Sequence, residues 1–366
     1  MKPSERLQSL DALRGFDMLF IMGFASLVVA VCGLWPNAVT DSIASQMGHA
    51  SWDGFTHHDT IFPLFLFIAG VSFPYSVAKQ RAGGMSEGRI YAKIVRRGLT
   101  LVVLGMVYNG LFKLDFENLR IASVLGRIGL AWSIAAVLYL NFGVKTRAAI
   151  AVAVLAGYGA LSALVAAPDA AGAGPLTFEG NLAGYIDRQF LPGKLIYGSF
   201  DPEGLLSTVP AVVTAMLGMF TGEFVRRSDI RGGRKTLWMA AAAAALLAAG
   251  LAFSGVLPVN KKLWSSTFVC VVGAYSLGMF ALFYYLIDVR GWRRWTLFFR
   301  VVGLNSITIY LAQRIVGFGR ISDFFLGGIA SKCPEAVAAV ISSAGYVAVC
   351  WLFLYFLYRK NVFLKV

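Results

Sequence analysis

The chain has 366 residues, of which 58% are hydrophobic and only 14% are charged. Soluble globular domains carry roughly a quarter charged residues, so this composition excludes an ordinary soluble protein and indicates a membrane protein. The net charge of +14 is also typical of nucleic-acid-binding proteins, but cationic cytoplasmic loops explain it more simply in a membrane protein. We therefore expect no nucleic-acid partner.

Apolar segments recur along the whole chain, most of them near the roughly twenty residues that cross a hydrocarbon core of about 30 Å. We predict ten spans, and the third and sixth are short. They cover residues 15–35, 61–78, 98–112, 121–141, 148–167, 209–224, 237–254, 266–287, 301–319 and 336–358. The expected fold is an all-α polytopic membrane protein with one transmembrane domain over residues 1–366.

The charges on the connecting segments predict the orientation of the chain. With the N-terminus in the cytoplasm, 23 of the 33 Lys and Arg residues fall on cytoplasmic segments and eight on the outer side. By the positive-inside rule we expect both termini in the cytoplasm. The long loops at about 36–60 and 168–208 then lie outside, where they could cover a cavity. The basic segment 79–97 is explained by topology and anionic lipid, or else by a phosphorylated cytoplasmic ligand.

The first outer loop holds all three histidines of the chain, His49, His57 and His58. Imidazole titrates near neutral pH, so a histidine that faces a cavity can accept or donate a proton. His49 is the leading candidate, because Gly48 before it gives backbone freedom and Trp52 after it offers an aromatic wall. An interfacial histidine without a catalytic role is the alternative.

His57, His58 and Asp59 are consecutive and invite a metal interpretation. Adjacent histidines point in different directions on a helix or strand, and a structural site wants about four ligands, so we expect no metal. Thr56 followed three residues later by Asp59 is a capping-box pattern at a helix start. Asp59 could both cap the helix and orient a nearby imidazole.

Two arginines, Arg127 and Arg314, fall inside predicted spans, where an ionisable side chain usually faces a partner or a wet cavity. Counted from Arg120 and Arg320 at 1.5 Å per residue, both are expected roughly 10 Å below the outer surface. There they could bind an anion, and a buried ion pair is the alternative. Asn305 in the ninth predicted span could bind a ligand or make interhelical hydrogen bonds.

Six stretches of the sequence occur in a familiar order. They are RLQSLDALRGFDM, HASWDGFTHHDTIFPLFLFIAG, LRIASVLGRIGLAW, DPEGLLSTVPAVVTAMLG, LPVNKKLWSSTFV and GLNSITIYL. Through them the chain resembles the catalytic membrane domain of the heparan-α-glucosaminide N-acetyltransferase family, within the wider group of transmembrane acyltransferases. The resemblance extends over most of the chain.

The resemblance implies roles for individual residues. His49 stands at the position of the family's active-site histidine, and Asp59 matches the Asp ahead of FPxFxFxxG. Arg127 matches the arginine of the fourth-span motif, although Gly126 replaces the usual Gln, and it is expected to bind the donor or the oxyanion. His57 and His58 lie outside the family pattern.

The remaining matches are expected to contribute to binding of the donor. Asn260, Lys261 and Trp264 match the family's N-K-x-L-W, although interface anchoring is the ordinary explanation for such a group. Asn305 matches the Asn of the ninth-span motif. Arg314, which we also assign to the donor, stands where relatives often differ.

The resemblance implies transfer of an acetyl group from cytoplasmic acetyl-CoA to an amino or hydroxyl group of a sugar or glycan at the outer face. His49 would act as general base or as acetyl acceptor, and the sequence leaves both mechanisms open. We expect a bacterial inner-membrane location and, from the resemblance, a homodimer. The rival is a transporter or flippase for a sugar-containing lipid, although no inverted repeat is visible.

Overall fold

The computed structural model describes residues 7–364, which form helices and connecting loops without a strand. In chain order the elements are α1 (Gln8–Leu19), the π-helical η1 (Phe20–Phe24), α2 (Ala25–Cys32), α3 (Ala38–Ser45), the 3₁₀ helix η2 (His57–Thr60), α4 (Ile61–Ala82), α5 (Glu87–Tyr108), η3 (Leu111–Lys113), α6 (Val124–Asn141), α7 (Val144–Leu164), α8 (Leu182–Phe190), α9 (Thr208–Arg226), α10 (Gly232–Phe253), α11 (Ser266–Phe283), η4 (Tyr284–Val289), α12 (Thr296–Leu304), α13 (Ser306–Ile315), α14 (Phe318–Ala330) and α15 (Glu335–Arg359).

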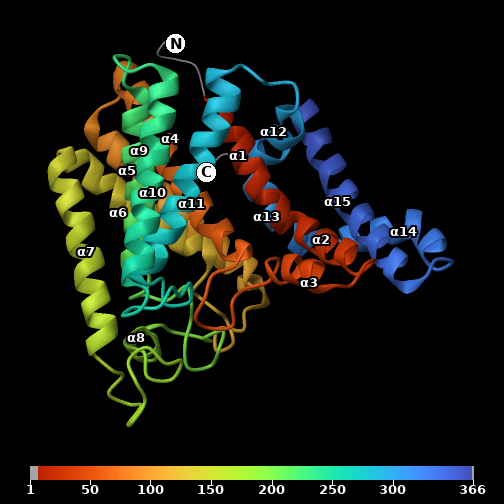
Figure 1. Ribbon diagram of the computed structural model, residues 1–366, viewed down its shortest axis with the longest axis horizontal. Helices are drawn as coiled ribbons and strands as arrows, with labels where there is room; N and C mark the ends of the chain where they lie inside the picture. The colour runs from red at the N-terminus through yellow and green to blue at the C-terminus, as the bar shows by residue number, and fades with distance from the viewer. Residues whose placement is uncertain (1–6, 365–366) are drawn as a thin grey trace.

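The long helices form one bundle around α4, which packs against α1, α6, α9 and α11 (Figure 1). α7 lies at one edge of the bundle, and α14 and α15 lie at the other. The long loop that carries α8 and the loop that follows α3 gather at the same end of the molecule. This shared end brings the two predicted outer loops together.

Eight helical segments are long and apolar enough to cross a membrane, counted over the described residues 7–364. They correspond to eight of the ten predicted spans, and they establish an integral membrane protein with the expected all-α polytopic fold. The third predicted span lies in α5, whose first half carries five charged side chains, from Glu87 to Arg97. The ninth is divided between α12 and α13, so the count of ten stays a prediction.

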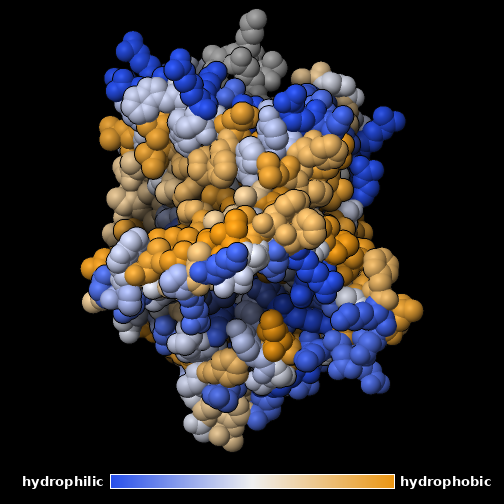
Figure 2. Space-filling model, turned by 90° about the vertical axis from the view of Figure 1, so that its right-hand side faces the viewer, coloured by the Kyte–Doolittle hydropathy of each residue, from blue (hydrophilic) through white to orange (hydrophobic). Residues whose placement is uncertain are grey.

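The surface agrees with this assignment. Figure 2 shows a hydrophobic belt between two hydrophilic zones, and below the belt the surface is hollowed and hydrophilic. A belt of this kind is what a lipid bilayer requires of the protein surface that it covers. The hydrophilic hollow lies toward the end of the molecule that carries the long loops.

Two of the membrane segments are interrupted. Gly23 has a φ of 111° inside η1, where the first span changes from π-helical to α-helical geometry. Asn305 has φ −121° and ψ 27° and separates α12 from α13. Irregular backbone is tolerated at membrane depth only inside the protein or beside a cavity, and Asn305 is indeed 1% exposed.

Glycines allow α4 and α9 to approach closely at the centre of the bundle. A Cβ atom on Gly70 would overlap the carbonyl oxygen of Ala215, and one on Gly218 would overlap that of Phe67. In lipid, where helices gain little from burying apolar surface, such close backbone packing is a main source of association. It holds α4, which continues directly from the histidine loop, in a fixed position.

We therefore expect Gly218→Leu to lower the thermal stability of the purified protein by several degrees, because the side chain must force α4 and α9 apart. Gly157→Leu in α7 is the matched control, since a Cβ there meets nothing within 4 Å. Thermal unfolding in detergent measures both. Equal unfolding temperatures for the two variants would contradict this packing.

Candidate active site

A cavity of about 320 Å³ opens between the two long loops at the loop end of the bundle. We call it the outer pocket. Its walls come from the loops after α3, α8 and α10, the loop before α6, the starts of α4 and α6, and parts of η1, η2 and α13. They are formed by Ile21, His49, Ala50, Trp52, His58, Asp59, Ile61, Phe62, Arg120, Val124, Ile196, Tyr197, Pro202, Glu203, Lys261, Lys262 and Tyr310.

His49 and Asp59 form a hydrogen-bonded pair in this pocket. His49 Nδ1 lies 2.8 Å from Asp59 Oδ1, and the His49 side chain is half exposed whereas that of Asp59 is 1% exposed. Asp59 Oδ2 lies 3.3 Å from the N–H groups of Ala50 and Thr56 and 2.9 Å from the Thr56 hydroxyl. A carboxylate with this many donors is ionised, and it accepts a hydrogen bond from Nδ1 in the tautomer that carries the ring proton there. Nε2 is then the basic nitrogen of the ring.

The start of helix η2 holds Asp59 where its carboxylate can pair with His49. The predicted capping box of Thr56 and Asp59 is confirmed: each side chain pairs with the backbone of the other at the start of η2. The Thr56 hydroxyl also lies 2.7 Å from the carbonyl oxygen of Gly48, directly before His49. The cap therefore ties the histidine loop to the end of the α4 span.

Lys261 reaches the same pair from the loop between α10 and α11. Its Nζ lies 3.0 Å from His49 Nδ1, 3.4 Å from His49 Nε2 and 3.5 Å from Asp59 Oδ1. Burial lowers the pKa of Lys261, and the Asp59 carboxylate beside it acts in the opposite direction. The sequence grouped Lys261 with donor-binding residues, whereas its position makes it a partner of His49.

The other two histidines diverge, as expected for adjacent residues. The His58 ring packs against that of His49 with centroids 4.5 Å apart and lines the outer pocket. His57 turns toward the bundle, where its Nε2 lies 3.2 Å from the Tyr275 hydroxyl and its ring packs on Phe20. Among the described residues 7–364 we find no group of three or more His, Cys, Asp or Glu side chains with metal-ligating geometry.

Arg120 and Glu203 form another wall of the pocket, and the buried Asp201 supports it from behind. Arg120 donates to both oxygens of the fully buried Asp201, at 2.7 Å each, and also pairs with Glu203. Tyr310 completes this wall from α13. None of these residues was singled out from the sequence, because Arg120 and Asp201 are 81 positions apart and only the fold joins them.

Three of the predicted donor-binding residues, Arg127, Asn260 and Trp264, lie behind the pocket and support it. Arg127 is 2% exposed and donates to the carbonyl oxygen of Pro202 and to Ser207, while its guanidinium lies over the Trp264 ring at 4.9 Å. Asn260 donates to Asp53 and accepts from the N–H of Leu263. In this structure Arg127, Asn260 and Trp264 hold the outer loops in place.

The depth of Arg314 stays a prediction, and its side chain is not among those that line the outer pocket. α13 ends at Ile315, so Arg314 lies in its last turn and is exposed. Its guanidinium packs over the Tyr108 ring at 4.9 Å, and Tyr108 stacks on Tyr310.

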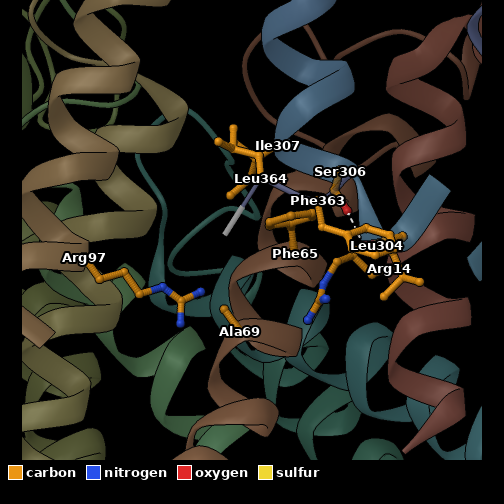
Figure 3. A pocket seen from close by; sticks show the side chains of 10 residues that line it. Arg14, Phe65, Ala69, Arg97, Leu304, Ser306, Ile307, Phe363 and Leu364 are labelled. Atoms are coloured by element: carbon orange, nitrogen blue, oxygen red, sulfur yellow. Dashed lines mark hydrogen bonds between the residues drawn. The ribbon is translucent and has the colours of Figure 1, made fainter. Parts of the chain in front are cut away.

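A second cavity of about 430 Å³ opens at the other end of the bundle, and we call it the inner cavity. It is lined by Arg14, Phe65, Ala69, Arg97, Gly303, Leu304, Ser306, Ile307, Phe363 and Leu364 (Figure 3). The break at Asn305 shapes one wall, since Leu304 and Ser306 flank it. The Asn305 Nδ2 is buried without a hydrogen-bond partner among the described residues.

Arg97 gives this cavity a strong positive charge on one side. Its guanidinium lies 4.3 Å above the Trp132 ring, and its buried Nε has no hydrogen-bond partner within residues 7–364. Arg97 also lines an adjoining cavity of about 570 Å³ together with Lys93 and Arg96. Arg97 belongs to the basic segment 79–97, for which the sequence allowed a phosphorylated ligand as the alternative to lipid.

The two cavities lie back to back along two helices. On α4, Phe62 lines the outer pocket and Phe65 the inner cavity; on α13, Tyr310 lines the outer pocket and Ile307 the inner cavity. Three residues of helix correspond to a rise of about 4.5 Å. One layer of side chains therefore separates the site of His49 from the cavity that contains Arg97.

Asp187 in α8 supports the loop that carries Glu203, and it gives a pH-dependent prediction. Its side chain is fully buried and accepts the N–H of Leu205 at 2.9 Å. Burial raises the pKa of Asp187 to about 6, and the nearby Asp201 adds to the rise. A raised carboxyl pKa means that folding favours the protonated form, so this contribution is lost as the pH rises through about 6.

We expect Asp187→Asn to raise thermal stability at pH 7.5 by up to about 2 kcal/mol relative to the parent, with the difference vanishing near pH 4. Thermal unfolding of both proteins from pH 4 to 8 tests this. A constant difference at every pH would show that Asp187 does not titrate in this range.

The catalytic family described as "Heparan-alpha-glucosaminide N-acetyltransferase, catalytic" matches residues 6–255, which is more than half of the chain. The chain belongs to this family. The predicted family resemblance is thereby confirmed. The matched range includes the His49 loop, Arg97 and Arg127, whereas Lys261 and Asn305 lie beyond it.

Two curated relatives bear the name heparan-alpha-glucosaminide N-acetyltransferase. The human protein is 28% identical over 375 residues, which cover 87% of this chain and 55% of the human protein. The mouse protein is 26% identical over 372 residues, which cover 87% of this chain and 56% of the mouse protein. The chain thus spans about half the length of the curated relatives it matches.

Proposed function

We propose that this protein transfers an acetyl group from acetyl-CoA, held in the inner cavity, to an amino or hydroxyl group of a sugar or glycan in the outer pocket. The observation that carries the proposal is the back-to-back arrangement of a cationic cavity and a His–Asp pocket, separated by one layer of side chains. Family membership supports acetyl transfer as the chemistry. A homodimer stays a prediction.

The orientation of the protein follows from where acetyl-CoA is available. The inner cavity opens beside the basic segment 79–97, which the positive-inside rule assigns to the cytoplasm. Acetyl-CoA is polyanionic and is made in the cytoplasm, so it would enter from this side. We place the protein in a bacterial inner membrane, with the histidine loop on the outer face.

Charged side chains would bind the nucleotide end of the donor, and the residues near Asn305 would contact its thiol arm. Arg14 and Arg97 lie on opposite sides of the inner cavity in Figure 3, where they could bind the phosphates of the nucleotide. The flexible thiol arm would then extend toward the Asn305 break and the layer around Phe62. The unpartnered Nδ2 of Asn305 offers a donor to an amide carbonyl of that arm.

Two mechanisms fit the geometry of His49. In the first, Nε2 accepts a proton from the acceptor as its nitrogen or oxygen attacks the thioester carbonyl, and then passes that proton to the departing CoA thiolate. In the second, Nε2 attacks the thioester carbonyl and CoA leaves as the thiolate; the acceptor nitrogen or oxygen then attacks acetyl-histidine, the bond to Nε2 breaks, and Nε2 takes the acceptor's proton. Lys261, 3.4 Å from Nε2, is placed to stabilise the oxyanion in either case. Ping-pong kinetics would indicate the second route.

The outer pocket has the character of a sugar site. Trp52, Tyr197 and Tyr310 contribute aromatic surface, and Glu203 and Arg120 contribute hydrogen-bonding groups. Sugars combine apolar ring faces with hydroxyl groups, so they need both kinds of contact. The pocket supports a small hydrophilic acceptor group better than an acyl chain.

Purified protein with labelled acetyl-CoA and a panel of amino sugars and glycans tests the enzymatic proposal. We expect label to move to at least one acceptor, in a time course that depends on protein concentration. The rival transporter would instead leave the label on CoA while a sugar-containing lipid crosses the bilayer of a reconstituted vesicle. That outcome would overturn the proposal.

We expect Arg97→Ala to raise the KM for acetyl-CoA about tenfold to a hundredfold with little change in kcat, because a phosphate contact is shared by ground state and transition state. Arg89→Ala is the matched control, since it removes the same charge from an exposed position on the same helix, α5. Steady-state kinetics with varied acetyl-CoA measures both. Equal KM values for the two variants would remove Arg97 from the donor site.

A further inference from the structure

The chain turns back on itself after α15. α15 ends at Arg359, and Asn361 adopts a left-handed conformation with a φ of 55°. The N–H of Val362 donates to the carbonyl oxygen of Leu357 at 2.9 Å, which closes a helix-terminating turn. Asn is among the few residues that tolerate this conformation, so the local sequence favours the reversal. We call residues 361–364 the C-terminal strap.

The strap reaches the inner cavity and forms part of its wall. Phe363 and Leu364 line the cavity together with Arg14, Phe65 and Arg97 (Figure 3). These residues come from segments far apart in the chain. An aromatic ring and two guanidinium groups on the walls of one cavity present the contacts that a purine nucleotide with phosphates requires: a flat face for the base and positive charge for the phosphates.

The strap is also the wall that can move most easily. The other walls belong to α1, α4, α5, α12 and α13, which are packed in the bundle. The strap is attached through its turn and through an edge contact between the rings of Phe363 and Tyr358, with centroids 6.4 Å apart. Val362 and Leu364 are 53% and 46% exposed. A segment with few buried contacts opens at low free-energy cost.

We propose that the C-terminal strap closes over the nucleotide half of the donor, with the Phe363 ring against the adenine base, and so controls how fast CoA leaves. This inference rests on the proposed function, since it assumes that CoA binds in the inner cavity. The strap opens for acetyl-CoA to enter, closes while the acetyl group reacts, and opens again to release CoA. Phe363 is thus a donor-positioning residue outside the family-matched range 6–255.

The test compares three variants of the full chain in lipid nanodiscs: Phe363→Ala, removal of residues 361–366, and the control Val362→Ala. Val362 lies in the strap but not among the residues that line the cavity. We expect Phe363→Ala to raise the Kd for CoA about tenfold, through faster dissociation, and the truncation to do so at least as strongly. Val362→Ala should stay within twofold of the parent. Thermal unfolding shows whether each variant folds. If the truncated chain does not fold, the result for Phe363→Ala alone tests the proposal.

Adenosine 3′,5′-bisphosphate, the nucleotide half of CoA, separates the strap from the rest of the site. Phe363→Ala should raise the Kd for this fragment by the same factor as the Kd for CoA. Unchanged Kd and dissociation rate in Phe363→Ala, or a loss seen with CoA but not with the fragment, would overturn the assignment.

The binding measurements give different results if the strap proposal is wrong and if the proposed function is wrong. If the parent binds CoA and Arg97→Ala weakens binding while Phe363→Ala does not, only the strap is wrong. If the parent binds no CoA, or if Arg97→Ala binds it as tightly as the parent, the proposed donor site itself fails.

Discussion

His49→Ala is expected to lower kcat for acetyl transfer about a thousandfold or more, with the protein still folded and still able to bind CoA. A positioned general base contributes roughly 10² to 10⁴ in rate, and a covalent acceptor contributes at least as much. The half-exposed ring lies at the end of the capped loop and is not packed in the core, so its removal should leave thermal unfolding nearly unchanged. Steady-state kinetics and CoA binding measure the two effects separately.

The matched control for this experiment is His57→Gln. His57 lies eight positions further along the same loop, but its Nε2 faces Tyr275 in the bundle and it does not line the outer pocket. We expect this variant to keep kcat within a few-fold of the parent. If His49→Ala transfers acetyl as fast as His57→Gln, then His49 is not the catalytic group.

Asp59→Asn is expected to lower kcat about a hundredfold, although the substitution keeps the shape of the side chain. The carboxylate fixes the proton on His49 Nδ1 across 2.8 Å, and an amide removes the charge that stabilises a protonated or acetylated imidazole. The variant also weakens the cap of η2, so a loss of thermal stability of about 1 kcal/mol should accompany it.

The pH profile distinguishes orientation of His49 from simple support of the loop. If Asp59 acts through His49, Asp59→Asn should displace the pH dependence of kcat as well as lower its maximum. Asp53→Asn is the control, because Asp53 is exposed in the same loop and accepts one hydrogen bond from Asn260. A parent-like pH profile in Asp59→Asn, with only lower stability, would assign Asp59 to capping alone.

The sequence predicted those features that depend on local pattern. Apolar segments of about twenty residues predicted the all-helical membrane fold, and Thr56 and Asp59 predicted the capping box, because both signals lie within a few neighbouring residues. The closeness of His49 and Asp59 could also be predicted from the sequence, since the cap fixes one end of a ten-residue loop. The catalytic roles of these two residues stay predictions.

Other features depend on tertiary packing and could not be read from local pattern. Lys261 is 212 positions from His49, and nothing in the sequence indicates that the two touch. The break at Asn305 falls inside an apolar segment that reads as continuous, so the local pattern did not reveal that α12 and α13 are separate helices. In the local sequence pattern, the inner cavity was indicated by the basic segment that includes Arg97.

The most direct test of the central claim is a sided transfer assay in vesicles whose loop orientation has been verified by protease access to the loop 168–208. In this proposal donor and acceptor enter from opposite ends of one bundle and meet between the two cavities. With labelled acetyl-CoA on the side of segment 79–97 and a membrane-impermeant amino sugar on the other side, label should appear on the sugar. His49→Ala vesicles should show none. Transfer only when donor and sugar are on the same side of the membrane would contradict the account.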